Sequence, residues 1–506
     1  MLTRRLATWF DDRLGASRFG RRALDKAFPD HWSFLLGEIA MYCFIVLVLT
    51  GTFLTFFFEP SSHDVVYNGS FHSLNGTHMS AAYRSTVGLS FDVRAGLVMR
   101  QMHHWAALLF LAAIVCHLCR IFFTGAFRRP REVNWIVGLS MLILGLANGF
   151  TGYSMPDDLL SGTGLRIAYS IATSVPLVGP WLASLFFGGK TITGQTIGRL
   201  FIIHVLFVPV LIAGLLSVHL AIVWRQKHTQ FPGRGRTEDN VVGARLWPTY
   251  AARSLGLFML VIGVVAALGG LFQINPVWLY GPYEPASVST AAQPDWYLGW
   301  TEGALRLMPA IHLRVLGYRV PEVFFPGVLL PGITFLLLFG WPFLEAKLSR
   351  DRREHHLLDR PRDRPIRTGL GVGVLAFYVI LFAAGAQDIW AQHLDVDVTT
   401  VRDVFRVLVF VVPLVVGVFT WKLCHDLALA VPLEEYRRGG DPPIGPNKPD
   451  EGLGDDESSR VDPGRLAKVG SAVAATAGAV GAAGGYMLGR RRPRTVRIRR
   501  PDPHDE

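Results

Sequence analysis

Two apolar stretches of the sequence each contain a pair of widely spaced histidines. His103 and His117 lie fourteen residues apart in one stretch. His204 and His219 lie fifteen residues apart in the other. At about 1.5 Å of rise per helical residue, the members of each pair are separated by roughly 21 to 22 Å along a helix. Imidazole is an axial ligand of haem iron, so two such helices side by side could hold two haems at two depths, with one histidine from each helix on each iron.

Two other apolar stretches contain glycines at nearly the same interval. Gly37 and Gly51 lie fourteen residues apart in the first of these stretches. Gly138 and Gly152 repeat the interval in the second. Glycine is common in membrane helices because it allows close helix approach, which is the ordinary explanation for any one of them. Four glycines at the histidine interval favour a second explanation, in which the missing side chains leave room for two porphyrin faces.

Two arginines accompany the first histidine pair. Arg100 and Arg120 each lie three residues outward from a histidine, on the same helix face. Either arginine could simply extend toward the membrane interface. Each could also bind a haem propionate, because the guanidinium group suits bidentate recognition of a carboxylate. Cys116 and Cys119 are followed by Arg120 and not by histidine, so covalent haem attachment is not indicated.

The composition is that of a membrane protein. The chain has 506 residues, of which 50% are hydrophobic, with 33 Phe and 13 Trp. Its apolar runs approach the 20 residues that a bilayer helix requires. We therefore predict an all-α integral membrane protein with eight transmembrane helices, the first four forming a di-haem bundle, and a polar C-terminal tail. The eight spans are predicted at 34–58, 98–123, 134–155, 201–224, 254–273, 323–344, 369–386 and 404–424.

The distribution of Lys and Arg predicts the orientation. Alternate connecting segments contain 24 of these residues (1–30, 120–131, 225–245 and 347–367) against 9 in the others (59–94, 156–199, 275–322 and 386–402). The positive-inside rule then predicts that both termini are cytoplasmic. The net charge of +11 is explained by cytoplasmic loops facing anionic lipid, and it requires no nucleic-acid partner.

The same features divide the chain into four regions. We predict an amphipathic cytoplasmic segment at 1–30, the di-haem bundle at 31–230, and a second transmembrane region at 231–430 with an outer loop at 274–322. Residues 431–506 are polar and then basic, which is typical of a largely disordered cytoplasmic tail. The stretch 469–489 is long enough for a ninth span, but its Ala and Gly composition favours the tail.

The outer loop contains a short motif that could do acid–base chemistry. It consists of Pro294, Asp295, Trp296 and Tyr297. A proline followed by an acid often does no more than start a helix. Its predicted position, outside the membrane and level with the outer histidine pair, makes Asp295 a candidate general base.

Together these residues resemble cytochrome b of the cytochrome bc complexes over about residues 30–425. The resemblance rests on the histidine and glycine pairs, Arg100, Arg120, the G-Y-x-x-P of 152–156, and the P-D-W-Y motif followed by Arg306 and Pro309. It implies two non-covalent b haems. His103 and His204 would hold the outer, low-potential haem. His117 and His219 would hold the inner, high-potential haem.

The resemblance also implies an activity and partners. It implies one subunit of a quinol–cytochrome c reductase in a bacterial cell membrane. Quinol would be oxidised at the P-D-W-Y site, electrons would pass through both haems to an inner quinone site, and the reaction would translocate protons in a Q cycle. The implied partners are a Rieske-type iron–sulfur subunit, a cytochrome c subunit, a second copy of the complex and a terminal oxidase.

The sequence departs from the common family pattern at several positions. Asp295 replaces the usual glutamate, and Asp157 and Asp158 replace a usual Trp-Gly pair. Trp224 stands where mitochondrial members have a histidine, so the inner quinone site is poorly defined. Candidates for that site are Arg225, Lys227, His228, Tyr250 and Arg253. The fifteen-residue histidine interval and the long C-terminal extension are similar to the actinobacterial branch.

Two other functions remain open from the residues alone. A di-haem b anchor of another quinone-linked dehydrogenase would explain the histidines, but not the P-D-W-Y loop or the four spans that follow. A non-redox transporter would be favoured by broken helices and internal repeats, and the histidine pattern is not repeated in the second half of the sequence.

Overall fold

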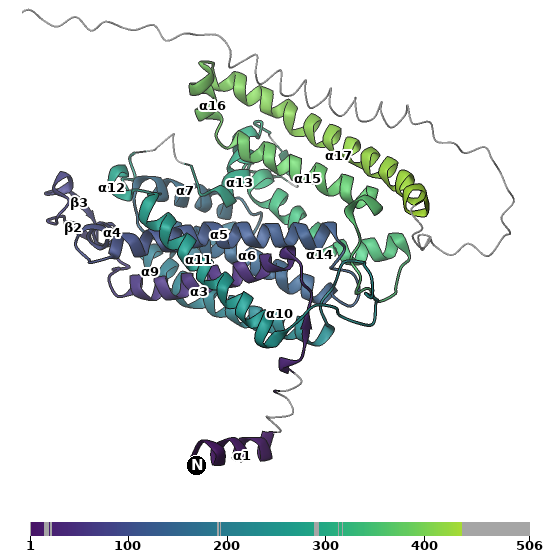
Figure 1. Cartoon of the computed structure of the whole chain (residues 1–506). Coiled ribbons are helices and arrows are strands. Elements are labelled where there is room, and N and C mark those ends of the chain that lie inside the picture. The colour runs from purple at the N-terminus through teal and green to yellow at the C-terminus, as the bar shows by residue number, and fades with distance from the viewer. Residues whose placement is uncertain are drawn as a thin grey trace, which may run out of the picture. The chain divides into compact units, whose positions relative to one another are not determined.

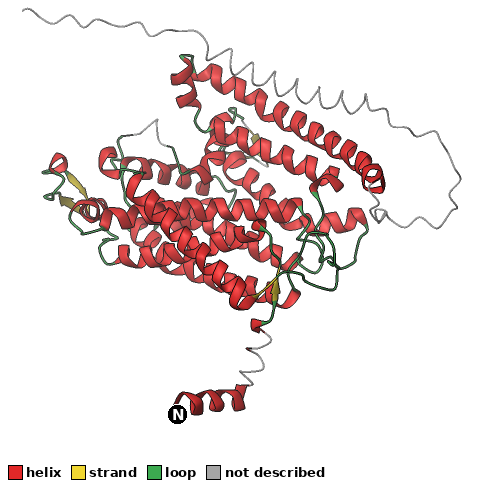
Figure 2. Ribbon diagram, in the orientation of Figure 1, coloured by secondary structure: helices red, strands yellow, loops and turns green. Residues whose placement is uncertain are grey.

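The computed structural model describes residues 2–14, 20, 23–189, 192, 194–287, 293–311, 313–315 and 317–437, and these residues are predominantly helical (Figure 2). The chain divides into two compact units, Met1–Glu434 and Glu435–Glu506. The predicted tail at 431–506, including the candidate ninth span at 469–489, lies almost wholly outside the described residues.

Eight helical segments of the described chain are long and apolar enough to cross a membrane, which confirms the predicted number. They are Trp32–Thr55, Gly96–Phe123, Glu132–Ser154, Thr196–Gln226, Leu246–Leu271, Phe325–Ser349, Pro365–Ala384 and Val398–Ala428. The fourth and fifth begin earlier than predicted, at Thr196 and Leu246. Polar residues such as Arg199 and Arg253 lie in these N-terminal parts, so hydropathy alone detects only the more apolar part of each helix.

The elements of the first half, in chain order, are as follows. They are α1 (Leu2–Leu14), β1 (Ala27–Phe28), η1 (Trp32–Phe34), α3 (Leu35–Thr55), β2 (Asp64–Val66), η2 (His72–Leu74), β3 (His78–Ser80), α4 (Ala81–Phe91), α5 (Gly96–Phe123), α6 (Glu132–Ser154), α7 (Leu159–Thr173), α8 (Gly179–Phe187), α9 (Thr196–Ile202), the π-helical turn η3 (Ile203–Phe207) and α10 (Val208–Gln226).

The second half continues the same helical pattern. Its elements are β4 (Ala244–Arg245), the π-helical turn η4 (Leu246–Tyr250), α11 (Ala251–Leu271), α12 (Val277–Tyr280), α13 (Trp296–Leu307), β5 (Leu313–Val315), β6 (Tyr318–Val320), the π-helical turn η5 (Phe325–Leu329), α14 (Leu330–Ser349), η6 (Pro361–Asp363), α15 (Pro365–Ala384), α16 (Gln387–Leu394) and α17 (Val398–Arg437).

Four long helices pack as two neighbouring pairs (Figure 1). Helix α3 packs along α5, α6 packs along α10, and α5 also contacts α6. Helix α11, which the sequence assigns to the second region, packs against α3 and α5. The core between them contains buried Cys43, Ala106, Leu111, Leu139 and Val265. Small residues such as Ala106 let the helix backbones approach closely, as is common in membrane bundles.

Many apolar side chains point away from this core. Leu336 and Leu348 on α14 and Phe410 and Leu414 on α17 are all strongly exposed. In a soluble protein so much exposed apolar surface would be a liability, whereas lipid accommodates it. The exposed apolar surface therefore agrees with helices that face a bilayer.

Three small antiparallel ladders were not predicted from the sequence. Ladder β2–β3 pairs Val65 with Met79, and β5–β6 pairs Arg314 with Arg319. Ladder β1–β4 pairs Ala27 with Arg245, which ties the segment before α3 to the segment before α11. Strands of two or three residues are too short for their side chains to show the alternation by which strands are recognised.

A short helix outside the spans is fixed by one of the unusual acids. The Asp158 carboxylate accepts hydrogen bonds from the backbone N–H groups of Leu160 (2.9 Å) and Ser161 (3.2 Å) and caps α7. The Ser161 hydroxyl accepts from the Asp158 N–H in return, completing a capping box. The acid at position 158 therefore serves as the N-cap of α7.

Candidate functional site

The four histidines meet as two pairs. The imidazole rings of His103 on α5 and His204 on η3 have centroids 6.1 Å apart and planes inclined at 67°. Metal–imidazole bonds of about 2 Å on both sides of one metal atom would hold two rings at a similar separation. His117 and His219 lie further along the same two spans, His117 beside Gly37 and His219 beside Gly138. Their assignment as haem ligands stays a prediction, but each pair has one histidine from each of the two expected helices.

One nitrogen of each ring in the first pair is already held. Nδ1 of His103 hydrogen-bonds the Thr50 hydroxyl at 3.0 Å. Nδ1 of His204 hydrogen-bonds the carbonyl oxygen of Asn148 at 2.9 Å. Because a carbonyl can only accept, His204 carries its proton on Nδ1 and its Nε2 lone pair is free. Metal-binding histidines typically show this arrangement, in which the second nitrogen is fixed by another group.

Each predicted glycine lies directly beside one of the histidines. The distances from an added Cβ atom to the nearest imidazole atom would be 3.2 Å for Gly37 with His117, 3.1 Å for Gly51 with His103 and 3.7 Å for Gly138 with His219. At Gly152 an added Cβ would overlap the ring of His204. The glycines thus make room for the imidazole rings themselves. The expectation that they also leave room for two porphyrin faces stays a prediction.

A π-helical turn explains the fifteen-residue histidine interval. His204 lies in η3, and a π-helical turn inserts one extra residue into a helix. The residue that the π-helical turn inserts accounts for the fifteenth position. His204 and His219 therefore have nearly the same rotation about the helix axis relative to each other as His103 and His117. The interval alone did not show this, because a fifteen-residue spacing on an unbroken helix would rotate the second histidine away.

Both predicted arginines have buried nitrogen atoms without partners. Among the described residues, nothing hydrogen-bonds Nε of Arg100, or Nε and Nη2 of Arg120. Arg100 Nη2 donates to the Asn275 carbonyl at 3.1 Å, and the Arg120 guanidinium lies over the Phe34 ring at 4.2 Å. Buried guanidinium N–H groups are costly to leave unpaired, so these positions suit an anionic group such as a haem propionate.

The ligand set itself fits haem. Within the described ranges, no group of three or more His, Cys, Asp and Glu side chains could hold a metal ion alone. Two opposed imidazoles complement a tetrapyrrole, which brings its own four equatorial nitrogens. The unpaired arginine nitrogens agree with the same group.

Asp295 contacts His104, a residue that the sequence analysis missed. Its Oδ1 is 2.9 Å from Nε2 of His104, the neighbour of His103 on α5. The Tyr297 hydroxyl donates to Asp295 Oδ2 at 3.1 Å. The only signal for His104 in the sequence was the histidine doublet, which does not show that the second ring points toward a loop 191 residues away.

The other members of the P-D-W-Y motif have different environments. Tyr297 is buried and packs against Gly149, and burial, with the nearby Asp295 carboxylate, raises the pKa of its phenol well above the usual value. It therefore remains a hydrogen-bond donor. Trp296 is 36% exposed, and Pro294 is half-buried where it leads into α13. Only Asp295 and Tyr297 are brought together as a polar pair.

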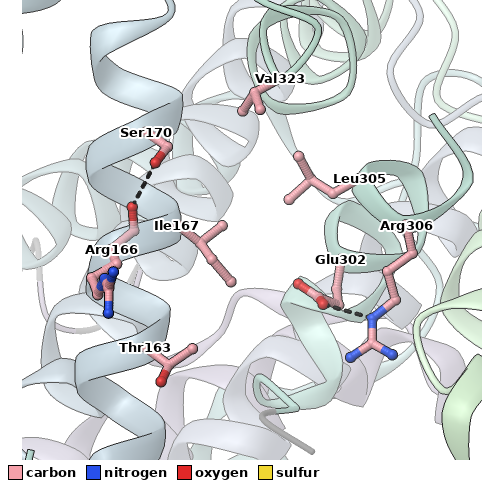
Figure 3. Close-up of a pocket in the computed structure, with 8 residues that line it drawn as sticks. All are labelled: Thr163, Arg166, Ile167, Ser170, Glu302, Leu305, Arg306 and Val323. Carbon is pink, nitrogen blue, oxygen red and sulfur yellow. Dashed lines mark hydrogen bonds and ion pairs between the residues drawn. The ribbon is translucent and has the colours of Figure 1, made fainter. Parts of the chain in front are cut away.

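A cavity of about 440 Å³ lies between α7 and α13 (Figure 3). Its lining is Thr163, Arg166, Ile167, Ser170, Glu302, Leu305, Arg306 and Val323. Arg306 Nε donates to Glu302 Oε1 at 2.7 Å, and its Nη1 donates to Asp388 at 2.9 Å. The volume is within the usual range for small-molecule sites. Glu302 was not predicted, because a helical Glu–Arg pair at i,i+4 is ordinary on any helix.

The candidates for the inner quinone site separate into two groups. Tyr250 stacks on Phe28 at 4.3 Å between ring centroids, and His228 lies 4.5 Å from the same ring. Arg253 instead pairs with Asp30 at an exposed position, at 2.9 Å. Two further candidates point elsewhere: Lys227 donates to the Asp239 carbonyl at 3.0 Å, and Arg225 is exposed. The structure brings only His228 and Tyr250 together.

The fold defines a multi-pass helical membrane protein, and its four histidines lie at two levels of two spans. The family described as Cytochrome b(N-terminal)/b6/petB matches residues 108–282. Similar relatives are cytochrome bc1 complex cytochrome b subunits. One from Corynebacterium efficiens is 50% identical over 407 residues, covering 80% of this chain and 75% of the relative. One from Streptomyces coelicolor is 47% identical over 429 residues, covering 84% and 78%.

A solved structure shows the same fold. A chain of a hyperthermophilic respiratory Complex III superposes with a TM-score of 0.60 at 20% identity, covering 82% of this chain and 99% of that one. The relatives' identity and coverage decide the family. The chain belongs to the cytochrome b subunits of cytochrome bc1 complexes, which confirms the resemblance and supports a subunit of a membrane redox complex over the transporter.

Proposed function

We propose that this chain oxidises quinol at the His103 end of the bundle and reduces quinone at the His117 end, with two b haems between the sites. The observation that carries the proposal is the pairing of histidines at two depths of the same two helices, each with a glycine beside it. Two bound haems would supply one-electron transfer between the membrane faces, over about 21 Å of helix. The coupled reactions would release protons on one side and take them up on the other.

The residues of the His103 end have distinct roles in this proposal. The cavity between α7 and α13 would bind the quinol ring, with Leu305 and Val323 among its apolar walls. Asp295 would accept a proton from a quinol hydroxyl, which requires a hydrogen bond to that hydroxyl. His104 would orient the Asp295 carboxylate through the 2.9 Å contact. Buried Tyr297 would donate to the same carboxylate and remain protonated.

The orientation follows from charge. The excess of Lys and Arg in alternate segments favours cytoplasmic termini and an outer position for the P-D-W-Y loop, in a bacterial cell membrane. This chain would then need a Rieske-type iron–sulfur subunit and a cytochrome c subunit on the outer side to accept electrons. We expect the complex to be a homodimer surrounded by lipid, and to associate with a terminal oxidase.

The test is the haem content of histidine variants in the purified complex. We expect His103→Leu or His204→Leu to remove one b haem and to abolish quinol oxidation. A dithionite-reduced spectrum counts the haems, and a redox titration separates their potentials. Two b haems of unchanged potentials in either variant would refute the ligand assignment, and a parent complex without a b-type band would refute the proposed function.

A further inference from the structure

Glu38 is a carboxylate within a membrane-spanning helix, and it has no role in the haem sites or at the quinol-oxidising end. Glu38 lies in the first turn of α3, inside the span Trp32–Thr55. A carboxylate in the first helical turn is stabilised by the positive end of the helix dipole. That role requires no partner from another helix. Ionisable side chains inside spans are rare and commonly mark proton or ion paths, so the surroundings of Glu38 decide between these roles.

Three hydroxyl groups converge on Glu38. Tyr42, one turn further along α3, donates to Oε2 at 3.2 Å. Ser254 on α11 donates to Oε2 at 2.7 Å. The Tyr250 hydroxyl on η4 donates to Oε1. Two of the three donors come from another part of the chain, more than 200 residues away, which a role at the helix terminus would not require.

Aromatic rings adjoin the cluster formed by Glu38 and the three hydroxyls that donate to it. Tyr250, which contacts Glu38, stacks on Phe28, and His228 lies on the same ring. Phe28 is held there by the β1–β4 ladder. A flat aromatic ligand could be recognised by such rings through offset stacking.

His228 has an unused hydrogen-bonding atom in this aromatic group. Its Nδ1 is buried and has no hydrogen-bond partner within the described part of the chain. Burial, reinforced by the nearby cations Lys26, Arg131 and Arg120, lowers the pKa of His228 to about 4, so the ring is neutral at neutral pH. A buried imidazole nitrogen without a partner indicates a polar group of a ligand, because leaving it unpaired is costly.

The cluster also adjoins the second histidine level. Gly37 directly precedes Glu38 and lies beside His117. A Cβ atom added to Gly37 would be 3.2 Å from the nearest atom of the His117 ring. A ligand beside Glu38 would therefore lie near the group bound by His117 and His219. Proton and electron transfer to one ligand both need short distances, and this position provides them together.

We propose that Glu38 holds and delivers a proton to a quinone that binds against Phe28, Tyr250 and His228. The inference rests on the proposed function and names the acid of its inner site. Reduction of a quinone adds two electrons and two protons, one proton to each carbonyl oxygen. A one-electron reductant of the haem class would supply the two electrons one at a time, being reduced again between the two transfers. The Glu38 carboxyl supplies one proton and is reprotonated from cytoplasmic water, which also supplies the second.

The surrounding hydroxyls suit Glu38 once it has given up its proton. As a carboxylate it accepts from Tyr42, Tyr250 and Ser254, and hydrogen bonds to the charged form stabilise it after the proton has left. These donors are neutral and do not compete for the transferred proton. The low local dielectric strengthens such contacts.

The test uses the intact complex and the variant Glu38→Gln. The complex is reduced with stoichiometric dithionite and mixed anaerobically with decylubiquinone or with 2,3-dimethyl-1,4-naphthoquinone, whichever reoxidises the parent. We expect reoxidation of the b bands to be slower by roughly tenfold or more, since general acid catalysis contributes at least that much. A redox-difference infrared spectrum should also lose a carboxylic acid C=O band.

Two further variants keep the result interpretable. Glu59→Gln makes the same change at the exposed pair with Arg84 and should retain both the rate and the infrared band. Tyr250→Phe removes one donor while preserving the stack, so it should shift the band and slow reoxidation even if Glu38→Gln does not assemble. Parental rates and bands in Glu38→Gln, or an unshifted band in Tyr250→Phe, overturn the inference. A parent complex that neither quinone reoxidises refutes the proposed function instead.

Discussion

The two ends of the bundle hold a carboxylate in different ways. At the His103 end, Asp295 comes from the loop that precedes α13, outside the spans, and contacts an imidazole and a phenol. At the His117 end, Glu38 belongs to a span and contacts three hydroxyls. Asp295 contacts His104, the chain neighbour of a paired histidine, whereas Glu38 directly follows Gly37, a glycine that lies beside His117.

The difference indicates how each end could work. A carboxylate on a connecting segment can be repositioned when that segment moves or contacts another subunit, which suits the release of protons to water. A carboxylate built into a packed span keeps a fixed distance from the redox group beside it, which suits the delivery of protons taken from the other side. Active-site residues on loops over a rigid scaffold are a common arrangement.

The largest expected effect compares glycines at the two ends. An added Cβ at Gly152 would overlap the His204 ring, whereas at Gly138 it would make an ordinary contact with His219 at 3.7 Å. We therefore expect Gly152→Ala to lose one b haem and quinol oxidation, and Gly138→Ala to retain both haems. The measurement is the ratio of haem to protein in the purified complex. Equal haem loss in both variants would contradict the difference between the two ends.

The next effect concerns the carboxylate of the His103 end. We expect Asp295→Asn to slow quinol oxidation by roughly 100-fold, the lower range for loss of a general base, while both haems remain. The rate of haem reduction by quinol in a single turnover measures this step directly. Unchanged rates across roughly pH 6 to 8 would remove Asp295 from the proton path.

A smaller effect is expected for the residue that positions Asp295. His104→Gln replaces the imidazole N–H with an amide donor of different geometry, so quinol oxidation should fall only by a few-fold, in line with the weakening of a hydrogen bond worth about 1 kcal/mol. The haem spectrum and the potentials should stay as in the parent. A haem loss as large as that of His103→Leu would show that His104 supports the haem pocket instead.

The smallest effect is expected at the other end. Arg253 forms an exposed pair with Asp30, and the side chains are 56% and 64% exposed. Exposed pairs contribute about 0 to 1 kcal/mol, so Arg253→Gln should leave thermal stability and quinone reduction nearly unchanged. Reoxidation of the b haems by quinone tests this. A loss comparable to that of Glu38→Gln would place Arg253 in the inner site.

Much of the arrangement was predictable because its signals are local. The spans are apolar runs of sufficient length, and the histidine and glycine intervals follow from the rise and period of a single helix. The glycine interval therefore predicts two glycine depths that match the two histidine depths. The π-helical turn at His204 was not predictable, since the extra residue has no characteristic composition there.

The sequence alone determined the number of spans, the two histidine levels and the family, because hydrophobicity, helical period and residue identity do not depend on how the helices pack. Only the tertiary structure decided that His104 contacts Asp295 and that Tyr250 and Ser254 contact Glu38. These contacts join residues 191 to 216 positions apart. Their existence depends on which faces of distant helices meet, and that choice is made by packing over the whole bundle.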